Sequence, residues 1–161
     1  MDGDPAGRYG SIMRRLAGVT TIGVLLCGLL CGCWLVPGPR TDACVDWVRF
    51  ETMQQRFDHA GVVLVGTPLK RDGEVQIYGY QANVHVVEAE QVLKGGLGAG
   101  PVRIASMPVT CGTSYPDGDP LDAGGRQLFF LTQQNGEWFT MTPDQGAVPF
   151  PAGTPLPFTT G

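Results

Sequence analysis

The sequence is poor in charge and in the residues that most often build catalytic or metal sites. Only 16% of its 161 residues are charged, and it has two histidines, His59 and His85. No two cysteines have the Cys-x-x-Cys spacing of common zinc and redox sites. Basic residues are outnumbered, 11 against 15, and form no evident patch, so nucleic-acid binding is not expected. We find no catalytic signature, and we predict neither an enzyme nor a bound cofactor or metal ion.

The beginning of the chain has the layout of an export signal. Arg8, Arg14 and Arg15 precede an uncharged, mostly apolar run at 16–36. A basic start, an apolar core and small residues near a cleavage site are typical of secretory signals. The adjacent Arg14 and Arg15 also suggest twin-arginine export, and the choice between this route and the general secretory (Sec) route stays open.

Within this run, the sequence LCGC at 30–33 resembles a bacterial lipobox, whose last cysteine is lipidated. The resemblance implies cleavage before Cys33 and the attachment of acyl chains, such as palmitate, to that residue. Two such chains hold a protein stably at a bilayer, at about 0.8 kcal/mol per buried methylene. We predict a signal peptide at 1–32 and a lipidated tether at 33–43, on the extracytoplasmic face of the cell membrane. The alternatives are an uncleaved signal anchor and cleavage after Ala43.

After this processing Cys44 and Cys111 are the cysteines that remain with an unmodified sulfur. An even pair of cysteines in an oxidising compartment predicts a disulfide bond. A zinc site and a redox-active thiol pair are the alternatives, and only the two histidines could assist them.

The hydrophobic period of the mature chain changes after residue 59. From Val45 to His59 the apolar residues recur every three or four positions, which predicts a helix. Short apolar or alternating stretches follow and predict strands. These strands fall at 61–67, 80–94 and 101–107, and in a hairpin at 126–142 whose turn is Asn135-Gly136. Adjacent Val86 and Val87 predict a bulge or a phase change within the second strand.

Five strands, one N-terminal helix and glycine-rich turns predict a mostly β fold, a small five-stranded barrel. We assign residues 44–142 to this domain. Five prolines between Pro143 and Pro157 then predict an extended, partly loose tail at 143–161.

Several segments carry a family resemblance when they are taken together. They are a cysteine before a helix, VVLVGT at 62–67, VHVVEAEQVLKG at 84–95, VTCG at 109–112 and the hairpin GRQLFFL…GEWFTM. In this combination the chain resembles bacterial proteins with a domain similar to tissue inhibitors of metalloproteinases. The resemblance covers about residues 44–142 and implies an OB-like barrel, to which Cys111 ties the segment that begins at Cys44. The Cys-x-Cys of the animal inhibitors is not reproduced, because Asp46 stands where the second cysteine would be.

Three polar features of the sequence are candidate sites. GGLGAG at 95–100 lacks the following helix and the Lys-Ser/Thr pair of a phosphate loop, so it is predicted to be a flexible connection. The aspartates of DGDPLD at 117–122 match only part of a calcium loop and are predicted to lie in a solvated turn. His85 falls on the polar face of its strand and is predicted to be a surface residue, and His59 a residue at the end of the helix.

These observations predict a lipid-anchored extracytoplasmic binding module whose partner is a protein or glycan of the cell envelope. The alternative is an envelope enzyme or a protease inhibitor whose site is formed by the fold. A convergent polar cleft would favour an enzyme, whereas an exposed apolar surface would favour partner binding.

Overall fold

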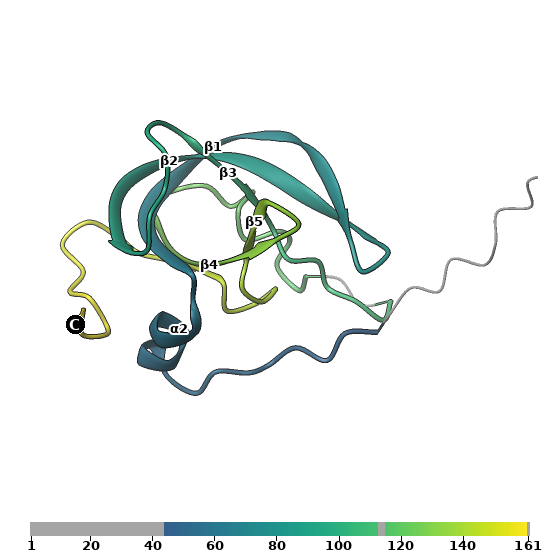
Figure 1. Cartoon of the computed structure of the whole chain (residues 1–161), viewed down its shortest axis with the longest axis horizontal. Coiled ribbons are helices and arrows are strands. Elements are labelled where there is room, and N and C mark those ends of the chain that lie inside the picture. The colour runs from purple at the N-terminus through teal and green to yellow at the C-terminus, as the bar shows by residue number, and fades with distance from the viewer. Residues whose placement is uncertain (1–43, 113–114, 161) are drawn as a thin grey trace, which may run out of the picture. The chain divides into compact units, whose positions relative to one another are not determined.

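The computed structural model describes residues 44–112 and 115–160 (Figure 1). The predicted signal peptide, Cys33 and the tether lie outside the described residues. The described chain is mostly β, with six strands in one sheet and one short helix. None of the helical structure within these ranges is long and apolar enough to cross a membrane.

Five of the six strands close into a ring. The elements are α2 (Met53–His59), β1 (Val62–Ile77), β2 (Tyr80–Lys94), β3 (Val102–Ala105), β4 (Gln127–Gln134), β5 (Glu137–Thr140) and β6 (Ala147–Pro149). Their order in the sheet is β1-β2-β3-β5-β4-β6, and β1 also pairs with β4. All pairs are antiparallel except β3 with β5. The five predicted strands are therefore present, although β1 ends at Ile77 rather than Thr67, and β6 was not predicted.

The inside of the ring is a hydrophobic core. One buried cluster takes Leu64 from β1, Val87 from β2, Ile104 from β3 and Phe129 from β4, and Trp138 of β5 packs against it. Because side chains alternate between the two faces of a strand, the neighbours of each of these residues along its own strand point out of the ring. Two further clusters cover the outside of the ring. One lies between β1, β4, α2 and the chain end, and the other lies over β2, β3 and β5.

The bulge predicted in β2 at Val86 and Val87 is absent, because these two residues pair in regular register with β3, and the nearest irregularity is in the partner strand β1. Pro68 pairs with Val87 and Lys70 with Val86, which leaves Leu69 as an extra residue in β1. The irregularity thus lies in β1, opposite the two adjacent valines of β2. Leu69 is 53% exposed, as expected of a residue that the ladder does not hold.

The helix is shorter than predicted. Residues 44–50 have no regular structure, and α2 begins at Met53. The Thr52 side chain accepts a hydrogen bond from the Gln55 backbone N–H at 3.1 Å, and the Gln55 side chain accepts one from the Thr52 backbone N–H. This capping box fixes the start of α2. Within 45–50, Trp47 and Phe50 pack against the rest of the fold but Val48 is 66% exposed, so the apolar spacing does not mark one buried helical face.

The chain end packs against the ring. The strand β6 pairs with β4, and Figure 1 shows the end of the chain beside α2. Phe158 is buried and stacks on Phe57 of α2, with 4.5 Å between ring centroids. The Arg126 side chain also donates a hydrogen bond to the Phe150 carbonyl at 2.8 Å. The sequence predicted an extended and partly loose tail at 143–161. Most of this segment does lack regular structure, but its aromatic residues belong to a core cluster.

The turn between β4 and β5 has the predicted chemistry. Asn135 and Gly136 have φ of 52° and 86°, as a type I′ turn requires. We expect the double substitution Asn135→Ala/Gly136→Ala to lower the free energy of unfolding by about 1–3 kcal/mol, because alanine is strained at positive φ. Thermal melting measures the loss. Gly96→Ala is the matched control, since Gly96 has open space around it and no positive φ. Equal melting temperatures for the two variants would contradict the assignment.

Candidate functional site

The predicted surface histidine, His85, is buried, with only 2% of its surface exposed. It lies two residues before Val87 on β2 and pairs with Ile104 of β3, both of which face the inside of the ring. The prediction was wrong because both faces of β2 are covered here. Ala82 and Val84, which form the apolar face, pack in the cluster outside the ring.

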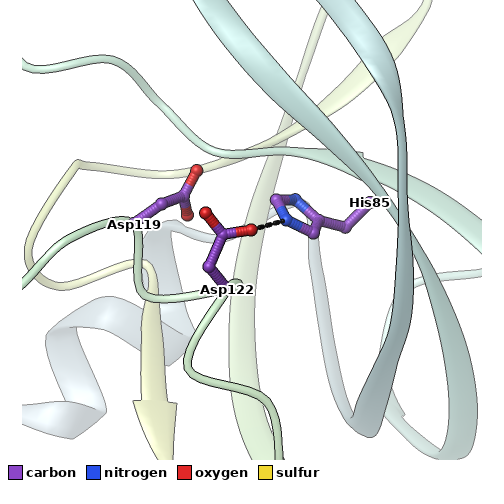
Figure 2. Close-up of side chains that lie close together, drawn as sticks. All are labelled: His85, Asp119 and Asp122. Carbon is purple, nitrogen blue, oxygen red and sulfur yellow. Dashed lines mark hydrogen bonds and ion pairs between the residues drawn. The ribbon is translucent and has the colours of Figure 1, made fainter.

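Asp122 reaches His85 from the connection between β3 and β4. Figure 2 shows the Asp122 carboxylate directed at the imidazole, with 2.8 Å between Oδ1 and the His85 Nε2 atom. The other oxygen of Asp122 pairs with the Arg71 guanidinium of β1. One carboxylate therefore joins β1, β2 and the β3–β4 connection.

Asp119 makes a second set of bonds on the same connection. Its side chain accepts hydrogen bonds from the Ser106 hydroxyl at 2.6 Å, the Asn83 amide at 2.8 Å and the Leu121 backbone N–H at 3.0 Å. Asp119 is 8% exposed, so the prediction of a solvated turn is wrong at this residue. Its two side-chain partners, Asn83 on β2 and Ser106 just after β3, lie 36 and 13 residues away, and this is why local spacing did not reveal them.

An apolar residue lies between the two aspartates. Leu121 is 1% exposed and belongs to the cluster inside the ring. The β3–β4 connection thus closes one part of the ring with a leucine, and the two flanking carboxylates bond to the strands. In this arrangement the acidic residues hold a segment of chain in place.

The hydrogen bonds set the charge state of Asp122. Partial burial raises the pKa of this carboxyl, but the hydrogen bonds to His85 and Arg71 and the charge of Arg71 lower it by more. The pKa of Asp122 is therefore below its ordinary value. His85 donates from Nε2 to this carboxylate, and its Nδ1 atom has no hydrogen-bond partner among the described residues.

His85, Asp119 and Asp122 also have the composition of a metal site, with one ligand atom from each residue within 4.8 Å of the others. However, all four carboxylate oxygens already accept hydrogen bonds or face a cation. An ion would compete with these donors and would lie beside the positive charge of Arg71. The cluster fits a network that anchors the β3–β4 connection better than it fits a cation site.

We expect Asp122→Asn to lower the free energy of unfolding by about 1 kcal/mol at pH 7, because the hydrogen bond to the buried His85 loses its charged acceptor. The effect is small because the carboxylate is 43% exposed and solvent screens its charge. Because the pKa of Asp122 is lowered in the folded state, its contribution is complete above the ordinary carboxyl pKa of about 4. It is lost as the pH falls through the folded pKa, so the two proteins should converge in strong acid.

Urea unfolding at several pH values measures this difference. Asp72→Asn is the matched control, because Asp72 pairs with Arg103 at 3.3 Å on the surface and should contribute about 0.5 kcal/mol or less. A constant difference between wild type and Asp122→Asn at all pH values would contradict the role of the carboxylate charge.

A second candidate region is the segment at 45–50, which we call the N-terminal strip. The predicted disulfide joins Cys44 to Cys111, with 5.1 Å between their Cα atoms. Next to it, Val45 exchanges two hydrogen bonds with the Thr110 hydroxyl, each at 3.1 Å. At the other end, the backbone N–H and carbonyl of Phe50 bond to the Gln145 side chain at 2.9 and 3.0 Å. The strip is thus fixed at both ends.

Between these ends the strip presents apolar surface. Trp47 is partly buried against the outside of the ring, and its ring lies 6.0 Å from that of Tyr78. Val48 is 66% exposed, the highest value among the large hydrophobic residues that the structure describes as exposed. Pockets of about 470 and 280 Å³ adjoin the strip. The larger has Cys111, Tyr115 and Pro143 in its wall, and the smaller has Tyr78, Met107 and Met141.

No protein-family model and no curated protein sequence matches this chain. The two candidate regions differ in their geometry. In the His85 region nearly every polar group has a partner within the fold, whereas the N-terminal strip offers exposed apolar atoms beside open pockets. The strip is the better candidate for contact with another molecule.

Proposed function

We propose that the chain is a lipid-anchored extracytoplasmic binding module that holds a protein of the cell envelope through its N-terminal strip. The observation that carries the proposal is the exposure of Val48 beside Trp47 and Tyr78, on a segment fixed at both ends. A fixed segment loses little conformational freedom on binding. Aromatic residues are also enriched among those that dominate binding energy at protein interfaces.

The fold and the location are part of the same proposal. A ring of five strands with one short helix is compatible with an OB-like barrel similar to the domain of tissue inhibitors of metalloproteinases. A disulfide is compatible with an oxidising compartment, and the sequence at 30–33 with lipidation. The tether at 33–43 would span at most roughly 40 Å when fully extended, which would keep the partner near the membrane.

The anchor is tested at Cys33. We expect Cys33→Ser to abolish acylation and to accumulate as the unprocessed precursor, because the modified sulfur is gone. Fatty-acid labelling and the mass of the N-terminal peptide measure this. Cys31→Ser is the matched control and should be processed normally, since that residue leaves with the signal. Normal processing of Cys33→Ser, or a mature protein that begins at Cys44, would contradict the proposal.

The binding surface is tested by photocrosslinking in intact cells. A photoreactive amino acid at position 48 should give adducts with one defined protein. The same amino acid at position 92 should give no adduct, although Val92 is also exposed, at 43%. It lies near the C-terminal end of β2. Adducts at both positions, or at neither, would overturn the proposal. Adducts with a glycan would change the class of partner, and a protease captured at position 48 would favour the inhibitor alternative.

A further inference from the structure

The N-terminal strip is attached to the ring without taking part in its sheet. Among the residues that the structure describes, no backbone–backbone hydrogen bond joins residues 44–50 to another segment. The strip depends on the Cys44–Cys111 bond, on the hydroxyl of Thr110, on the amide of Gln145 and on side-chain packing. The ring, by contrast, is closed by its own ladders and filled by its own core. Loss of the strip would leave those ladders intact.

The packing of the strip is imperfect. The indole N–H of Trp47 is buried and has no hydrogen-bond partner among the described residues. An unpaired buried donor disfavours the state that buries it, because the group has given up its bond to water. The packing of Trp47 alone therefore does not explain why the strip stays on the ring. The disulfide at Cys44 is needed to hold it there.

That covalent bond is open to attack. Cys44 and Cys111 are both exposed residues. Thiol–disulfide exchange requires that a thiolate can reach one of the two sulfurs, and buried disulfides are protected from it for this reason.

We propose that the Cys44–Cys111 bond is a redox-sensitive disulfide whose reduction releases the N-terminal strip while the five-stranded ring stays folded. The reductant is a dithiol. One of its thiolates attacks a sulfur of the pair, the S–S bond breaks, and a mixed disulfide forms. The second thiolate of the reductant then displaces the protein sulfur. The reductant gives up two electrons and becomes a disulfide, and Cys44 and Cys111 take up two protons as thiols.

Release would change the surface of the molecule. The strip carries Trp47 and Val48 away, and the apolar cluster on the outside of β2, β3 and β5 loses part of its cover. This inference concerns the conformation of the chain and stands whether or not the strip binds a partner.

Trypsin provides the test, because Arg49 lies in the strip and Arg103 lies in β3 of the ring. In the oxidised full-length chain the bond after Arg49 is protected, since Phe50 is buried and both its backbone groups bond to Gln145. After reduction with dithiothreitol we expect cleavage after Arg49 to become at least roughly tenfold faster, since cleavage follows the population of the open form. Cleavage after Arg103 requires unfolding of the ring, so it should remain much slower than cleavage after Arg49, even though loss of the disulfide lowers the stability of the whole domain. Mass spectrometry of the products measures both rates.

Two variants complete the test. Cys44→Ser/Cys111→Ser should be cleaved quickly after Arg49 with or without reductant, which excludes an effect of the reductant on other cysteines. Gln145→Ala keeps the disulfide and should still respond to reduction. An unchanged rate at Arg49 in reduced wild type would overturn the proposal. Equal rates of cleavage after Arg49 and Arg103 in the reduced protein would also overturn it, because the strip would then be released only when the whole domain unfolds.

Discussion

Removal of the Cys44–Cys111 bond, by reduction or by Cys44→Ser/Cys111→Ser, should lower the free energy of unfolding by up to about 4 kcal/mol. The bond joins residues 67 positions apart, so it removes a large amount of chain entropy from the unfolded state. Residual structure in the unfolded chain makes this an upper figure. Small domains have about 5–15 kcal/mol in total, so the reduced protein should melt at a much lower temperature and yet remain folded at 25 °C. Local release of the strip can then occur without global unfolding.

Calorimetry of oxidised and reduced protein measures the fall in melting temperature. The Ser/Ser variant is the control and should melt at the same temperature with and without reductant. Alkylation of the unfolded, unreduced protein, followed by peptide mapping, should label neither Cys44 nor Cys111. Two labelled thiols in protein taken from its native envelope would contradict both the disulfide and the argument that it stabilises the domain.

The strands of the ring could be predicted from the sequence because their signals are local. Apolar and alternating stretches marked every ring strand, and Asn135-Gly136 supplied a turn that only a few residue types tolerate. In each case the physical cause lies within a few residues of the pattern that reports it.

The candidate regions depend on contacts between residues that are distant in sequence, and there the sequence was a poor guide. His85 is buried because a connection that begins after β3 covers it, and its partner Asp122 is 37 residues away. The apolar spacing at 45–50 is compatible with a helix, but a disulfide to Cys111 and hydrogen bonds to Gln145 hold the segment in an irregular path. Tertiary contacts of this kind override local preference, and a single sequence does not reveal them.

The aromatic end of the chain should contribute several kcal/mol to stability, about as much as one residue of the ring core. Phe158 is 9% exposed, stacks on Phe57 and meets the edge of Phe130 with 6.0 Å between ring centroids. We expect Phe158→Ala to lower the free energy of unfolding by about 3–5 kcal/mol, the usual cost of removing a buried phenylalanine. Leu156→Ala is the control, since Leu156 is 39% exposed and should contribute about 0.5 kcal/mol. Urea unfolding measures both losses, and two equally small losses would mean that residues after Pro149 form a loose tail.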